Sequence, residues 1–162
     1  MNMTIKQIRR WAAAVAAICL LTLFLPLYGM TAFAATARIA FSDPTASVGS
    51  EINVKMKITS SDNLSTADIM LAYDANSLEF IEGTNAEGGN GAVRVHGDGG
   101  GANTTTLAYD LKFKASAAGT SKITVTSQEI YDASSQIVTV DKQGESQVTV
   151  SALSSASKDA SL

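Results

Sequence analysis

Residues 65–80 read STADIMLAYDANSLEF, and this stretch decides the fold that the sequence predicts. Ile69, Leu71 and Tyr73 alternate with residues of mixed character, so one face of the segment is apolar. A period of two is typical of a half-buried β-strand. Residues 74–77 predict a turn, because Asp, Asn and Ser side chains satisfy nearby backbone groups. We therefore expect a strand that carries the carboxylate of Asp68 in the middle of its outward face.

The same alternation recurs between residues 37 and 151, and it is clearest from Thr104 to Lys114. No segment keeps a helical period over three turns. Many short strands separated by turn residues are typical of an all-β sandwich or barrel. The apolar phase of each segment predicts the following buried residues: Ile39, Phe41, Ile52, Val54, Met56, Ile58, Ile69, Leu71, Tyr73, Leu78, Phe80, Leu107, Tyr109, Leu111, Phe113, Ile123, Val125, Val148 and Val150.

Three segments do not read as strands. Residues 82–91 and 97–103 are rich in glycine, which is costly to order, and we expect mobile surface loops there. Residues 92–96, between them, predict a short strand. Residues 152–162 are mainly Ser, Ala, Lys and Asp and predict a flexible tail.

The N-terminus predicts an export signal over residues 1–34. Basic residues precede an apolar run from about Trp11 to Leu27, and Ala32-Phe33-Ala34 supplies small residues at the two positions that signal peptidase reads. We expect cleavage before Ala35. A retained membrane anchor is the rival interpretation, although the apolar run is marginal in length for spanning a bilayer.

Cleavage at this position would leave a single domain at residues 35–151 without cysteine. Cys19 lies within the apolar run, and Ile18 before it is too bulky for a lipoprotein signal. The remaining chain has nine basic and fifteen acidic residues, a formal net charge of −6. Such a surface argues against nucleic acid and against anionic lipid as partners. Export without disulfides favours a bacterial protein that is secreted or held at the cell surface, with no membrane contact after cleavage.

The sequence shows no complete catalytic or metal-binding motif. His96 is the sole histidine and precedes a Gly-rich stretch that lacks the ending of a phosphate loop. One His with one Asp is too few ligands for zinc, and the segment at Asp74 lacks the glycine and closing glutamate of a calcium loop. A Ser-His-Asp triad stays open by composition, but no nucleophile elbow is present. We expect a non-enzyme without cofactor or metal.

Three blocks of this sequence resemble a bacterial cohesin domain. They are residues 37–41, residues 48–54 and the block from Ala67 to Phe80, which contains Tyr73-Asp74 and Leu78-Glu79-Phe80. The resemblance covers residues 37–151 and implies a jelly-roll-like antiparallel β-sandwich. It also implies a dockerin-bearing partner that carries its own calcium, in polysaccharide-degrading or cell-surface assemblies.

The resemblance also implies a docking face. In cohesins an Asp six residues before the Asp of the Tyr-Asp pair accepts hydrogen bonds from dockerin, and Asp68 stands at that position. Its outward neighbours on the same strand would be Thr66, Met70 and Ala72, with Arg94 and His96 on the next strand. Residues 82–106 are shorter and richer in glycine than in cohesins, which predicts that one or two strands are lost or trimmed there.

Two other functions remain open at this stage. Carbohydrate-binding modules share the superfold, which keeps a polysaccharide ligand possible. Stacking on sugars needs exposed aromatic side chains, however, and within residues 35–151 Tyr131 is the one aromatic residue that does not fall in phase with the core. An adhesin or spacer domain without a ligand site is the third reading.

Overall fold

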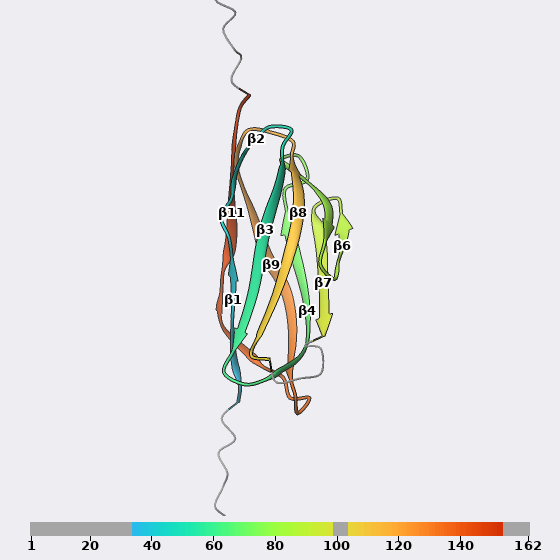
Figure 1. The fold of residues 1–162 in the computed structure, drawn as a ribbon, viewed down its shortest axis with the longest axis vertical. Coiled ribbons are helices and arrows are strands. Elements are labelled where there is room, and N and C mark those ends of the chain that lie inside the picture. The colour runs from blue at the N-terminus through green and yellow to red at the C-terminus, as the bar shows by residue number, and fades with distance from the viewer. Residues whose placement is uncertain (1–33, 99–103, 154–162) are drawn as a thin grey trace, which may run out of the picture. The chain divides into compact units, whose positions relative to one another are not determined.

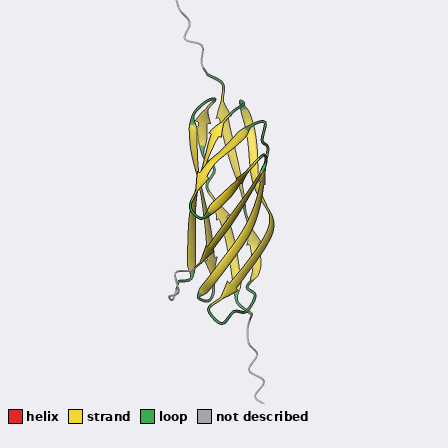
Figure 2. Ribbon diagram, turned by 90° about the vertical axis from the view of Figure 1, so that its right-hand side faces the viewer, coloured by secondary structure: helices red, strands yellow, loops and turns green. Residues whose placement is uncertain are grey.

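The computed structural model describes residues 34–98 and 104–153 (Figure 1). The predicted signal peptide up to Phe33, the centre of the second Gly-rich segment and most of the predicted tail lie outside the described residues. Within the described ranges the chain forms strands, turns and loops (Figure 2). None of the described segments is a helix with the length and hydropathy needed to cross a membrane.

Eleven strands form one continuous sheet with the order β10-β1-β3-β8-β5-β6-β7-β4-β9-β11-β2. The strands are β1 (Thr36–Phe41), β2 (Thr45–Ser47), β3 (Glu51–Ser60), β4 (Leu64–Tyr73), β5 (Leu78–Gly83), β6 (Ala86–Gly89), β7 (Ala92–Asp98), β8 (Thr106–Ala115), β9 (Gly119–Asp132), β10 (Thr139–Gln143) and β11 (Glu145–Ser151).

The sheet curls so that its two halves face each other across one core. One half contains β10, β1, β3, β8 and β5, the other contains β7, β4, β9, β11 and β2, and β6 connects them. The inward side chains of both halves belong to a single apolar cluster. Neighbouring strands are antiparallel except in two outer pairs, β1 with β10 and β11 with β2, which are parallel. The predicted all-β, jelly-roll-like sandwich is confirmed, with these two parallel pairs in addition.

Burial follows the alternation of the sequence. In β3 every second residue from Ile52 to Ser60 is buried, while the residues between them are exposed. The predicted core residues are buried with two exceptions, Phe41 and Phe80, which are half-buried. Phe41 is the last residue of β1, and Phe80 precedes an irregularity in the pairing of β5 with β8. Phe80 still packs edge-to-face on Phe113, with 5.4 Å between the ring centroids.

The prediction of loops at residues 82–91 and 97–103 was wrong for residues 82–83, 86–89 and 97–98, which lie in strands, while residues 84–85 and 90–91 form turns. Strand β5 continues to Gly83, β6 pairs with β7, and β7 continues through Asp98. The Gly-rich middle therefore keeps two strands, β6 and β7, of which β7 pairs with β4, whereas β6 pairs with β5 and β7. Its glycine content has a packing reason at Gly88, where a Cβ atom would lie 2.3 Å from the carbonyl oxygen of Ala92.

Candidate functional site

The outer face of β4 and β7 brings the predicted site residues together. Thr66, Asp68, Met70 and Ala72 alternate with buried residues along β4, and all four are half-buried. Across the ladder to β7, Asp68 stands opposite His96, and Met70 opposite Arg94. Directly opposed residues of an antiparallel pair project to the same side of the sheet. The six predicted residues thus share one face, centred on Asp68.

An ion pair between Asp68 and Arg94 forms the polar centre of this face. The Nε atom of Arg94 donates to Oδ1 of Asp68 at 2.9 Å, and its Nη2 atom donates to Oδ2. This bidentate interaction fixes the orientation of both the carboxylate and the guanidinium group. Hydrogen bonding to the guanidinium lowers the pKa of the Asp68 carboxyl below its usual range and raises the pKa of Arg94. Their side chains are 29% and 46% exposed, so a partner can still reach both.

Two further groups surround this pair. The Nδ1 atom of His96 lies 3.6 Å from Oδ2 of Asp68, and the His96 side chain is 64% exposed. On β6, Glu87 stands opposite Arg94, and its carboxylate lies 4.0 Å from Nη1 of the guanidinium. The carboxylate of Asp68 is therefore held in place by its neighbours rather than standing alone on the strand.

Strand β9 borders β4 on its other edge, and the sequence did not reveal this. Glu129 stands opposite Asp68, Tyr131 opposite Thr66, and Ser127 opposite Met70. The register shifts between Met70 and Leu71, which changes the phase of β9 halfway along its length. The alternation that identifies outward residues is broken at that shift. Tyr131, which the alternation of the sequence places out of phase with the core, is half-buried beside this face.

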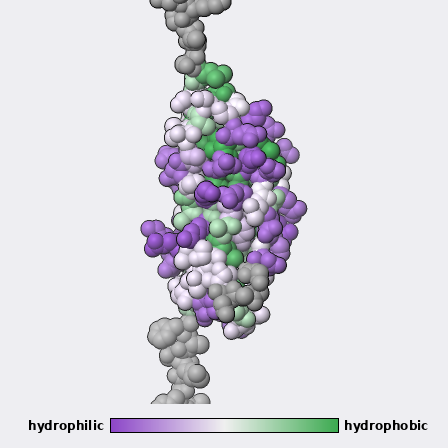
Figure 3. All heavy atoms as spheres, in the orientation of Figure 1, coloured by the Kyte–Doolittle hydropathy of each residue, from purple (hydrophilic) through white to green (hydrophobic). Residues whose placement is uncertain are grey.

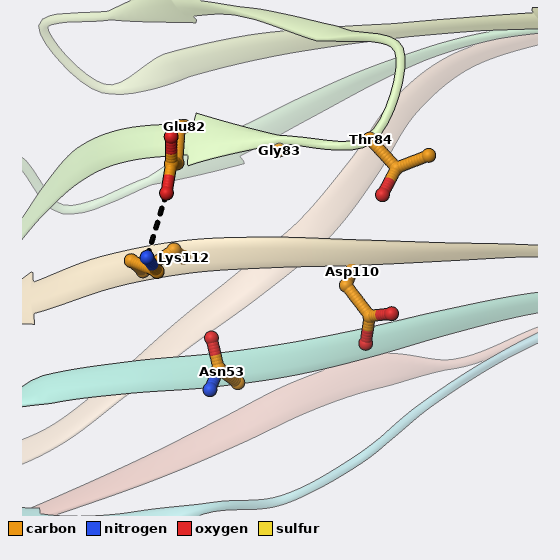
Figure 4. Close-up of a pocket in the computed structure, with 6 residues that line it drawn as sticks. All are labelled: Asn53, Glu82, Gly83, Thr84, Asp110 and Lys112. Carbon is orange, nitrogen blue, oxygen red and sulfur yellow. Dashed lines mark hydrogen bonds and ion pairs between the residues drawn. The ribbon is translucent and has the colours of Figure 1, made fainter.

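A shallow hollow of about 290 Å³ lies on the opposite half of the sheet (Figure 4). It is lined by Asn53, Glu82, Gly83, Thr84, Asp110 and Lys112. Lys112 donates to Glu82 at 2.6 Å, and this bond lowers the pKa of the Glu82 carboxyl. Hydrophilic side chains cover much of the surface over β3 and β8 (Figure 3). The lining holds no aromatic ring on which a sugar could stack.

The carboxylate of Asp74 accepts hydrogen bonds within the turn that it begins, residues 74–77. Its Oδ1 atom accepts from the backbone N–H of Asn76 at 2.9 Å, and its Oδ2 atom accepts from the hydroxyl of Ser77 at 2.7 Å. In the described part of the chain, no group of three or more His, Cys, Asp or Glu residues could hold a metal ion.

Comparisons with known proteins find likeness in structure and not in sequence. No protein-family model matches the chain, and no curated protein matches it. A non-cellulosomal cohesin from the hyperthermophilic archaeon Archaeoglobus fulgidus is similar at 20% identity and a TM-score of 0.62, covering 72% of this chain and 91% of that one.

Two cohesins solved in complex with dockerins are similar as well. The sixth cohesin of scaffoldin B from Acetivibrio cellulolyticus has 18% identity and a TM-score of 0.62, over 72% of this chain and 99% of its own. A type I cohesin of Clostridium thermocellum has 17% identity and a TM-score of 0.62, with the same two coverages. These likenesses show that the chain has the fold of a cohesin domain.

Proposed function

We propose that this chain is a non-catalytic, extracellular protein-binding module that docks a dockerin-bearing partner. The docking surface is the outer face of β7, β4 and β9, and the assembly serves polysaccharide degradation or attachment at the cell surface. The observation that carries the proposal is the half-exposed pair of Asp68 and Arg94 at the centre of this face. Asp68 stands at the position where the cohesin resemblance implies a dockerin-binding aspartate.

The geometry of the pair suits docking. A carboxylate offers about four lone-pair sites and a guanidinium five N–H donors, so each keeps capacity after the mutual bonds are made. Because both groups are fixed before binding, docking costs little side-chain entropy at these two residues. The proposal assigns calcium to the partner, in keeping with the use of the Asp74 carboxylate by its own turn.

Calorimetry with a calcium-loaded dockerin module tests the proposal. We expect Asp68→Asn to weaken binding by about 1–3 kcal/mol, the usual cost of a charge-assisted hydrogen bond lost from the centre of an interface. The matched control is Asp110→Asn on the opposite half of the sheet, where Asp110 forms a 2.8 Å ion pair with Lys55. Equal affinities for the two variants would remove Asp68 from the docking surface.

The same samples separate the competing functions. Retention of the chain on insoluble cellulose or xylan, without dockerin binding, would favour a carbohydrate-binding module. Retention on neither ligand would favour a spacer domain.

A further inference from the structure

Basic side chains gather on the half of the sheet that lies away from Asp68. Of the basic residues in the described ranges, Arg94 and Lys122 lie on β7 and β9, in the half that contains Asp68. The others lie on β1, β3, β8 and β10, and none of their side chains is buried: Arg38, Lys55, Lys57, Lys112, Lys114 and Lys142. The outer faces of two packed sheets are more than about 10 Å apart, whereas the Debye length is about 8 Å at physiological ionic strength. The negative net charge of the chain therefore does not exclude an anionic ligand on this half.

Acidic neighbours neutralise one side of this half and leave the other side basic. The lysines of β8 stand opposite acidic residues of β5, and Lys55 pairs with Asp110 at 2.8 Å. In the described part of the chain, Arg38, Lys57 and Lys142 take part in no ion pair. We call these three residues the basic edge.

Strand pairing places the three cations of the basic edge close together on one exposed face. Arg38 of β1 stands opposite Lys142 of β10 on one side and opposite Thr59 of β3 on the other. Lys57 lies two residues from Thr59 along β3, on the same side of the sheet, and an alanine stands opposite it on each neighbouring strand. Like charges on opposed residues destabilise a sheet. An anion bound between Arg38 and Lys142 would relieve their repulsion.

A hollow of about 350 Å³ adjoins the basic edge and is lined in part by Arg38. Its lining also includes the exposed residues Thr36, Thr59, Ser61 and Asp141. The Oγ atom of Ser61 accepts from the backbone N–H of Thr36 at 3.0 Å, so its own O–H remains available to donate. Asp141 is the extra residue at the irregularity between β1 and β10, and no ion pair of the described residues joins it to Arg38. The hollow thus offers one guanidinium, one carboxylate and several hydroxyls.

This combination of groups favours an acidic saccharide over other ligands. A guanidinium binds a carboxylate through two parallel N–H donors, and hydroxyls and a carboxylate exchange hydrogen bonds with the hydroxyls of a sugar. Neutral sugars stack on aromatic rings, and the hollow has no aromatic residue in its lining. Protein interfaces are anchored by aromatic and other large side chains in pockets. None of the exposed large hydrophobic residues in the described ranges lies on β1, β3 or β10.

We propose that the basic edge binds a polysaccharide that carries a carboxylate on its sugar units, a polyuronate. Arg38 binds one carboxylate, and the hollow beside it takes the hydroxyls of the same sugar unit. Lys142 is one strand away, about 4.8 Å, and Lys57 is a diagonal neighbour at about 7–8 Å, so both reach carboxylates of adjacent units. The site lies on the half of the sheet opposite Asp68. The polysaccharide and a partner on the docking face can therefore bind at the same time, and this inference does not depend on dockerin binding.

Calorimetric titration of the full chain with polygalacturonate tests the proposal. We expect binding that weakens as salt is added, because salt screens exposed charges. Arg38→Gln should lower the affinity about tenfold, and Lys57→Gln and Lys142→Gln about threefold each. Arg38→Lys keeps the charge but loses the planar fork of donors, so it should not restore the affinity. The matched control is Lys122→Gln, which removes one exposed charge from β9 on the other half of the sheet and should bind like the unaltered chain. Circular dichroism of each variant checks that the fold is retained.

Three further probes separate recognition of an acidic saccharide from recognition of charge alone. Methyl-esterified pectin keeps the sugar units without the charge, and polyglutamate keeps the carboxylates without the sugar hydroxyls. We expect both to bind at least about tenfold more weakly than polygalacturonate. Equal binding of polyglutamate would overturn the saccharide as the ligand, and tighter binding of polyphosphate would overturn the carboxylate. If the unaltered chain does not bind polygalacturonate, or if Lys122→Gln loses as much affinity as Arg38→Gln, the basic edge is not the binding site.

Discussion

The contact between Gly97 and Tyr109 gives the sharpest test of how the two halves of the sheet meet. Gly97 lies in β7 and is buried, and Tyr109 reaches it from β8 in the opposite half. A Cβ atom on Gly97 would lie 2.3 Å from the hydroxyl oxygen of Tyr109, 2.7 Å from Cε1 and 2.9 Å from Cζ. Gly97→Ala therefore forces the tyrosine ring to move. The ring is 4% exposed, so it cannot swing into solvent without opening the core.

The expected cost follows from two opposing effects. Overpacking of this kind destabilises by about 1–3 kcal/mol. Replacing a strand glycine by alanine recovers roughly 0.5–1 kcal/mol of backbone entropy. We expect Gly97→Ala to lower the free energy of unfolding by about 1 kcal/mol, the difference between the middle values of these two ranges.

A double-mutant cycle with Tyr109→Leu isolates the clash, because leucine leaves room beside residue 97. In that background Gly97→Ala should be neutral or stabilising by up to about 0.5–1 kcal/mol. Urea unfolding followed by circular dichroism gives the four free energies. If Gly97→Ala costs the same with Tyr109 and with leucine at position 109, the close packing of β7 on β8 is refuted.

Three further predictions concern the core, a turn and pH. Leu71→Ala should cost roughly 2–5 kcal/mol in urea unfolding, because Leu71 is 1% exposed in the central strand β4; a cost under about 1 kcal/mol would contradict its burial. Asn85 has a φ of 50°, so Asn85→Ala should lower the melting temperature while Asn85→Gly should not. The hydroxyl of Ser77 and the backbone N–H of Asn76 lower the pKa of Asp74, so its stabilising effect is full above about pH 4 and is lost as the pH falls through the lowered pKa. Thermal melts of Asp74→Asn and the unaltered chain should therefore differ at neutral pH and converge near pH 2; a constant difference would show that the charge of Asp74 does not support the turn.

The sequence by itself determined the features that are local to a single strand, namely which of its side chains point into the core and which point outward. Alternation in β3, β4 and β8 predicted which side of each strand is buried, because a side chain's direction in a strand is set by whether its position is odd or even. The same pattern placed Asp68 on an outward face. The alternation also predicted which side chains of β7 point outward, because Val93 and Val95, on either side of Arg94, are buried.

Local periodicity did not decide which strands lie beside β4: the cohesin resemblance implied the strand of Arg94 and His96, and only the tertiary structure placed β9 there. Backbone hydrogen bonds between strands are the same for nearly every residue, so the sequence of β4 does not state that β7 and β9 are its neighbours. That choice brings Arg94 onto the carboxylate of Asp68 and sets Glu129 opposite it. It also placed Gly97 in a strand rather than in the expected loop, because Gly97 pairs with Ala67 of β4. Packing between distant segments, which local periodicity does not encode, fixes the composition of the candidate docking face.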